Sequence, residues 1–193
     1  TDWPAVSSLA ARFPFVRPSY GLHPWDVGNA TPHWREALLR TLDANPGAAV
    51  GEIGLDRWIL ERARPDDPRL AGLRRAPLDE QLAAFTWQLA LAAGRDLPAS
   101  VHCLDAWGAL LDSLRSTARP SRGFLLHAYG GSAELARECT ALGAYFSFNG
   151  NFLPPSECHL LRDTARTRRY AAVFATLPLD RLLVETDAPA MPL

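Results

Sequence analysis

Six short apolar segments alternate along the chain with segments of helical periodicity, and this alternation constrains the fold more than any other feature. These segments are short, rich in apolar residues and not strictly alternating, which is typical of parallel strands that are buried on both faces. Strands that alternate with helices predict an α/β fold with a parallel sheet. The expected strands are residues 16–22, 48–55, 97–102, 123–127, 144–150 and 180–186.

Helices are expected between these strands and before the first one. Thr31 is expected to cap the helix at 31–43, with Pro32 at its first position, where a missing N–H does no harm. The helix expected at 79–95 places four apolar side chains on one face. These four are Leu82, Phe85, Leu89 and Ala92, and the other helices are expected at 2–12, 105–115, 132–143 and 168–178.

The bulk properties of the chain favour one domain inside the cell. Its 193 residues, 48% of them hydrophobic, are enough for one well-packed domain and short for two, so residues 1–193 are expected to form a single domain. No stretch approaches the roughly 20 apolar residues of a membrane helix. The net charge is −1, and the three cysteines are an odd number, which favours a reducing compartment. A cytoplasmic monomer with no membrane contact is expected.

The one long irregular segment is expected at 57–77, directly after the second strand. It holds six arginines and three acidic residues, a net charge of +3. Arginine suits bidentate contact with phosphate, so Arg74 and Arg75 are candidates for substrate binding. A solvated loop of mixed charge is an equally open interpretation. Trp25 and Trp58 could stack on bases or simply pack.

Polar residues follow the apolar runs at the carboxyl ends of the strands. Glu52, His102, His127 and Asp187 each lie near the end of a different strand, and His23 ends the first. Parallel α/β proteins and barrels build their sites at these ends, so distant residues would converge there. A single histidine at a strand end is more often a hydrogen-bonded structural residue. Repetition on four strands favours one or two cations that satisfy all of these nitrogen and oxygen donors together.

The ordered motifs of the chain resemble a known family. The segments that carry the resemblance are "GLHP", "GEIGLD", "VHCLDA", "LLHAYGGS", "YFSFNG" and "PLDRLLVETDAP", found between about residues 19 and 189. In this order they look like the TatD family of metal-dependent deoxyribonucleases. The resemblance implies a TIM-type barrel of the metal-dependent hydrolase superfamily.

The same resemblance implies a role for each candidate residue. Glu52 would be the carboxylate shared by two divalent ions, with Mg, Mn or Zn all plausible. His102 and His127 would bind one ion. Asp187 would bind the other and take the proton of the attacking water, so Asp187 and Glu52 are the expected catalytic residues. Contact with substrate, or support of the ligands, is expected from His23, Asp105, Arg74 and Arg75.

The chain departs from the family pattern at several points. It has no H-x-H pair, and its first strand matches the family's third. Leu104 stands where the family usually has arginine. A complete barrel needs eight strands and typically ~250 residues, so six strands would leave unpaired edges. We therefore expect an incomplete barrel, the central and C-terminal part of a TatD-like protein, truncated at both ends.

The reaction that these residues favour is hydrolysis of the phosphodiester bonds of DNA by a metal-activated water. Related barrel hydrolases that act on an amide, a lactone or a phosphotriester would use the same ligands, so the metal residues do not separate these chemistries. A third alternative, favoured by the absence of the H-x-H pair, is a metal-binding fragment without activity.

Overall fold

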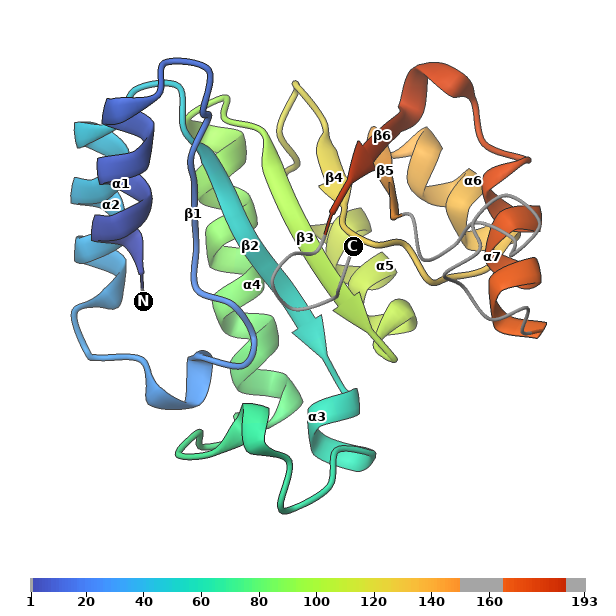
Figure 1. Ribbon diagram of the computed structural model, residues 1–193, viewed down its shortest axis with the longest axis horizontal. Coiled ribbons are helices and arrows are strands. Elements are labelled where there is room, and N and C mark those ends of the chain that lie inside the picture. Colours follow the sequence, from blue (N-terminus) through green and yellow to red (C-terminus); the bar gives the residue numbers. More distant parts are fainter. Residues whose placement is uncertain (1, 150–164, 187–193) are drawn as a thin grey trace. The chain divides into compact units, whose positions relative to one another are not determined.

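The predicted alternation of strands and helices is present in the structure, a computed structural model that describes residues 2–149 and 165–186 (Figure 1). The chain forms two compact units, residues 1–124 and 125–193. All six predicted strands are present, and they follow one another in chain order. The α/β fold class with six parallel strands is therefore confirmed.

The first unit is built around β2, Ala49–Asp56, which pairs in parallel with β1, Ser19–Tyr20, and with β3, Ala99–Leu104. The continuous apolar run of β2 is buried as expected, with Ile53 and Leu55 fully excluded from solvent. The helices of this unit are α1 (Trp3–Arg12), α2 (Trp34–Ala44), α3 (Trp58–Glu61), α4 (Leu78–Gly94) and α5 (Trp107–Ser116), with 3-10 turns η1 (Val27–Asn29) and η2 (Pro68–Leu70).

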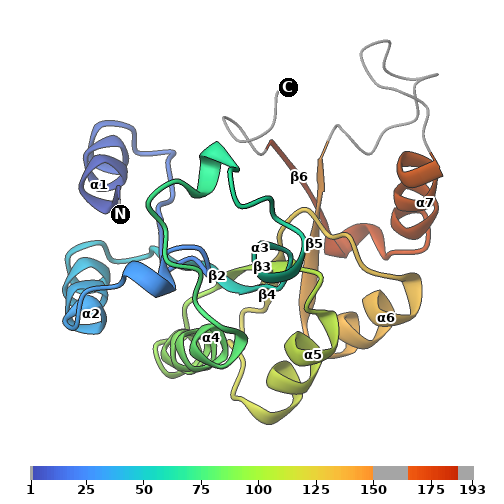
Figure 2. The same cartoon turned by 90° about the horizontal axis from the view of Figure 1, so that it is seen from below.

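Two helices of the first unit cover the same side of β2 and β3. Figure 2 shows α4 and α5 together on one side of these strands, and α4 packs along β2. Phe85 and Leu89 of α4 are fully buried there, as the predicted apolar face requires. Among the described residues no helix, α4 included, has the length and apolarity needed to cross a membrane.

The second unit pairs β5, Ala144–Asn149, in parallel with β6, Leu182–Glu185. Its core contains the edge-to-face pair of Tyr129 and Phe146, whose ring centroids lie 5.0 Å apart. Gly143 follows α6 with a φ of +97°, a conformation that suits glycine at the end of a helix. The remaining elements are β4 (Phe124–Leu126), which begins at the last residue of the first unit, α6 (Ala133–Ala141), α7 (Ala165–Phe174) and η4 (Leu179–Arg181).

The predicted start of α2 is two residues too early. The helix begins at Trp34, with His33 rather than Thr31 in the N-cap position. The backbone N–H of Trp34 bonds to the carbonyl of Thr31 at 3.1 Å and closes a turn before the helix. The first helical bond runs from Ala37 to His33, at 3.0 Å. A separate turn therefore occupies the positions where proline and threonine predicted a helical cap.

The segment 57–77 is also more ordered than its composition predicts. It contains α3 and η2, and its apolar residues form a small cluster of Ile59, Ala63 and Leu70. Trp25, Trp58, Leu60 and Leu73 pack against this cluster. The apolar residues interspersed among the arginines thus provide a local core, and the expectation of an irregular loop is corrected.

Two buried glutamines of α4 hold the backbone segments that carry the candidate site. The side-chain amide of Gln88 accepts from the N–H of Leu22 at 2.7 Å and donates to the carbonyl of Leu22 at 3.2 Å. Gln81 does the same at Asp56, accepting from its N–H at 2.8 Å and donating to its carbonyl at 3.1 Å. Both glutamines are fully buried. The predicted face of α4 included Leu82, which is only half-buried, and missed both glutamines.

Replacing Gln88 by methionine should destabilise the protein while keeping the volume of the side chain. The change leaves the buried N–H and carbonyl of Leu22 without their partner, and each such group costs about 1–3 kcal/mol. Urea unfolding should therefore show a loss of this order in the free energy of unfolding. Ala83→Met, on the exposed face of the same helix, is the control and should change stability by no more than about 0.5 kcal/mol. Equal stabilities for the two variants would contradict the anchoring role.

Candidate metal centre

The candidate site of the first unit lies beside the paired strands β2 and β3. In the register of these strands Gly54 lies opposite His102. Gly54 has a φ of +146°, and a Cβ atom there would lie 1.9 Å from the carbonyl oxygen of His102. Only glycine allows this approach, which explains one of the two glycines that flank Glu52. Glu52 of β2 and His102 of β3 are thereby brought side by side.

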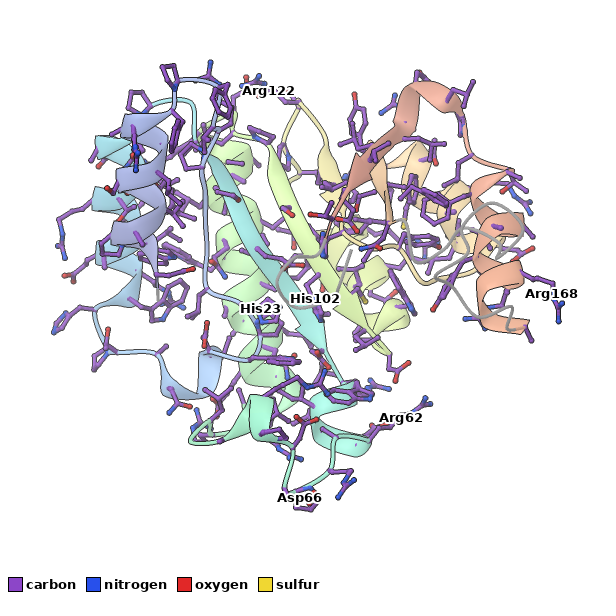
Figure 3. The ribbon with its side chains drawn as sticks, in the orientation of Figure 1. His23, Arg62, Asp66, His102, Arg122 and Arg168 are labelled. Atoms are coloured by element: carbon purple, nitrogen blue, oxygen red, sulfur yellow. The ribbon has the colours of Figure 1, made fainter. Side chains whose placement is uncertain are left out.

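His23, Glu52 and His102 form one cluster. The Nδ1 atom of His102 lies 3.5 Å from Oε1 of Glu52, and Nε2 of His23 lies 4.0 Å from Oε2 of the same carboxylate. The two imidazole rings meet edge to face with centroids 4.6 Å apart, and Figure 3 shows them side by side. One ligand atom from each of the three residues can be chosen so that all lie within 4.8 Å of one another. Imidazole nitrogen and carboxylate oxygen are donors that suit Zn, Mn or related divalent ions.

Asp56 contacts this cluster through His102. Its side chain is fully buried at the end of β2. One oxygen, Oδ2, accepts from the indole N–H of Trp25 at 2.6 Å and lies 3.1 Å from Nε2 of His102. The other oxygen, Oδ1, accepts from the backbone N–H of Ile59 at 2.9 Å. A buried carboxylate requires such partners, and here they connect Asp56 directly to a candidate metal ligand.

The imidazole of His102 lies between two carboxylates, and this changes its protonation. Burial lowers the pKa of His102, but its contacts with Asp56 and Glu52 outweigh burial and raise the pKa from 6.5 to about 9. In the metal-free protein near neutral pH, His102 is therefore an imidazolium that balances negative charge. A bound divalent cation would meet the same electrostatic requirement, so the residues present fit a metal ion.

His127 and Asp187 were expected to complete the site. His127 lies in the second unit, where its Nδ1 atom is 2.6 Å from Oε2 of Glu185. Asp187 lies outside the described residues. The convergence of both residues with Glu52 and His102 therefore stays a prediction.

The residues expected near the substrate have intramolecular partners in the structure. Asp105, which has a φ of +56°, lies 3.4 Å from the guanidinium Nε of Arg62. Arg74 donates to the carbonyl of Gly28 at 2.7 Å and forms a two-pronged ion pair with Glu80. Arg75 donates to the carbonyls of Ala63 and Arg64 at 3.2 and 2.8 Å. Each of these contacts involves a residue of the segment 57–77, and the expected phosphate contacts of Arg74 and Arg75 stay predictions.

Trp25 and Trp58 stack on each other. Their ring centroids lie 6.3 Å apart with the planes 19° from parallel. The guanidinium of Arg69 lies 5.9 Å from the ring of Trp25 and 5.1 Å from that of Trp58. Of the two interpretations left open by the sequence, the structure therefore shows packing. It also shows a role that the sequence analysis missed, because the indole of Trp25 reaches Asp56. The terminal aspartate of "GEIGLD" was the available signal, since it ends a buried strand.

An α/β sheet with a cluster of imidazole and carboxylate groups beside two of its parallel strands is typical of metal-dependent hydrolases. A family model described as TatD-related DNase matches residues 1–193, and the chain belongs to this family.

Two bacterial proteins are similar in sequence to most of this chain. The chain is 33% identical over 186 residues to the 3′-5′ ssDNA/RNA exonuclease TatD of Cronobacter turicensis, a match that covers 94% of this chain and 60% of the relative. It is 31% identical over 198 residues to the uncharacterized metal-dependent hydrolase YabD of Bacillus subtilis, with 97% and 66% covered.

The fold has a counterpart among solved structures. The crystal structure of YjjV, a TatD homologue from Escherichia coli K12, matches with a TM-score of 0.77 and 31% identity. That match covers 100% of this chain and 65% of YjjV. The chain thus spans between 60% and 66% of the length of these three proteins.

The raised pKa of His102 predicts a pH-dependent stability in the presence of a chelator. A raised pKa in the folded state contributes stability that is fully present below the usual pKa of 6.5 and is lost as the pH rises through about 9. The free energy of unfolding in urea should therefore fall across this window. His102→Gln removes the titrating group and should flatten that fall. Identical pH dependence in the two proteins would show that His102 is not held as an imidazolium.

Proposed function

We propose that the protein is a metal-dependent nuclease that hydrolyses phosphodiester bonds of single-stranded DNA. The observation that supports this most directly is the carboxylate of Glu52 facing Nδ1 of His102 at 3.5 Å, beside a second imidazole. Membership of the TatD-related DNase family supports the same reaction class. A relative named 3′-5′ ssDNA/RNA exonuclease supports single-stranded nucleic acid as the substrate.

Divalent metal ions, up to two in a complete site, are the cofactors that we propose. Glu52, His102 and His127 would hold one ion, and Asp187 together with Glu52 would hold the other. Bound ions of this kind polarise the phosphate and make an attacking water available at neutral pH. Mg, Mn and Zn are all compatible with a mixed set of imidazole and carboxylate donors.

The chain's own residues have three tasks in this proposal. Glu52 provides the negatively charged carboxylate that both ions would share. Asp187 takes a proton from the attacking water, a role that is worth about 10²–10⁴-fold in rate when a general base is well placed. The imidazoles of His23 and His102 are each partly open to solvent, at 24% and 19% of their side-chain surface, so substrate can reach the cluster.

Glu52→Gln should abolish most of the nuclease activity. The amide keeps the shape of the side chain but removes the negative charge that faces His102, and loss of a ligand should exceed the roughly 10–100-fold effect of a change in the residues around a metal site. The measurement is the shortening of an end-labelled single-stranded oligonucleotide in Mg²⁺, Mn²⁺ or Zn²⁺, with metal content determined in parallel.

A matched control is Glu36→Gln on the exposed surface of α2, which should retain both cleavage and metal content. Cleavage by Glu52→Gln at the parental rate would mean that the site is misassigned. A lactone, an amide and a phosphotriester tested beside the oligonucleotide address the related hydrolases. Turnover of one of these substrates without cleavage of DNA would replace the nuclease proposal by that chemistry.

A further inference from the structure

Trp25 contacts both imidazoles of the cluster, one directly and one through a carboxylate. Its backbone N–H donates to Nδ1 of His23 at 3.2 Å. Its indole N–H donates to Oδ2 of Asp56 at 2.6 Å, and this oxygen lies 3.1 Å from Nε2 of His102. A backbone N–H and an indole N–H can only donate. Trp25 is therefore the donor in both bonds. Its two acceptors, Nδ1 of His23 and Oδ2 of Asp56, in turn limit where protons lie on the two histidines.

We propose that Trp25 and Asp56 are positioning residues that give His23 and His102 opposite hydrogen placements, so that His102 offers Nδ1 to a metal while His23 offers an Nε2–H. The inference rests on the proposed metal-dependent function and deepens it, because it separates the ligand of the cluster from the hydrogen-bond donor.

The placement on His102 follows from the partners of Asp56. Its two oxygens accept from Trp25 and from the backbone of Ile59, and an ionised carboxylate can only accept. Nε2 of His102 must therefore donate to Asp56. The other ring nitrogen, Nδ1, points to Oε1 of Glu52 at 3.5 Å. When this nitrogen carries no proton, it and the carboxylate oxygen are two electron-rich atoms that a cation would bridge. Nδ1 is thus the metal-binding atom of His102.

The placement on His23 is the reverse. Because Nδ1 accepts from the backbone of Trp25, the proton of the neutral ring lies on Nε2. Nε2 faces Oε2 of Glu52 at 4.0 Å, which is too long for a direct hydrogen bond but close enough for attraction. A nitrogen that carries a proton does not bind a metal ion. His23 therefore stands beside the metal position as a donor suited to an anionic oxygen, such as that of a phosphodiester.

The environment of Trp25 keeps its indole in place for this task. The ring stacks on Trp58, and the guanidinium of Arg69 lies over both rings. Phenylalanine could fill the same stack but has no N–H for Asp56. The chemistry of the indole, beyond its volume, is thus what this position requires.

The test uses Zn²⁺ as the probe, with affinity measured by competition against a chelating indicator and no substrate present. Asp56→Asn should weaken Zn²⁺ binding by about 10–100-fold, as expected when the partner of a ligating histidine is changed. The amide cannot satisfy all three donors, since one of its two polar atoms is itself a donor. Trp25→Phe removes the indole N–H together with part of the ring, and should weaken binding in the same direction by about tenfold or less. Trp87→Phe, in the half-buried aromatic pair of Trp34 on α2 and Trp87 on α4, is the matched control and should leave the affinity unchanged.

Nitrogen NMR of the imidazoles in the Zn²⁺-loaded protein tests the placements directly, without any variant. The parent should show His102 with Zn²⁺ on Nδ1 and a proton on Nε2, and His23 with a proton on Nε2 and no metal. In Trp25→Phe the signals of His102 should shift while those of His23 keep their pattern, because the backbone N–H of residue 25 remains. A merely structural role of Trp25 would not produce this selective shift.

Zn²⁺ bound through Nε2 of His102, or to His23, would overturn the proposal, and so would unchanged affinity in both Asp56→Asn and Trp25→Phe. These outcomes are distinct from failure of the nuclease proposal. The expected imidazole pattern without cleavage of DNA would leave the positioning role intact and remove the reaction. Metal-dependent cleavage with the reversed imidazole pattern would support the nuclease reaction and overturn the positioning role.

Discussion

A buried carboxylate must receive hydrogen bonds, and Asp56 at the end of β2 receives them from three different parts of the first unit. An indole, a backbone amide and an imidazole meet there, from Trp25, Ile59 and His102. These donors belong to the segment after β1, to α3 and to β3. The hydrogen bonds to the carboxylate of Asp56 thus connect three segments to β2. Because Glu52 lies four residues earlier on the same strand, the candidate metal centre depends on this arrangement.

The second unit contains a comparable pair of imidazole and carboxylate. Nδ1 of His127 lies 2.6 Å from Glu185, whereas the carboxylate of Asp56 contacts Nε2 of His102. Histidines that bind metals usually donate their other ring N–H to such a partner, which fixes the orientation of the ring. Both histidines that we propose as ligands therefore have the support that the role requires, although each uses a different nitrogen for it.

The sequence predicts the elements of this fold better than it predicts their contacts. Apolar runs located all six strands, because such runs are typical of parallel strands. Periodicity alone did not reveal Gln81 and Gln88, since a buried glutamine is recognisable only once its backbone partner is known. In the site, strand ends indicated Glu52 and His102. The part of Trp25 was missed, because Asp56 at the end of a buried strand signals a carboxylate that needs partners but does not show that the indole N–H of Trp25 is one of them.

The two glutamines of α4 fix the distance between two backbone segments beside the cluster. They stand seven residues apart, two helical turns or about 10 Å, and they hold the backbone at Leu22 and at Asp56. The helix therefore sets the spacing between the chain beside His23 and the end of β2 at Asp56. One residue inserted between the glutamines would rotate one of them by about 100° away from its partner. The number of residues between the two glutamines is consequently constrained by the backbone positions that they hold.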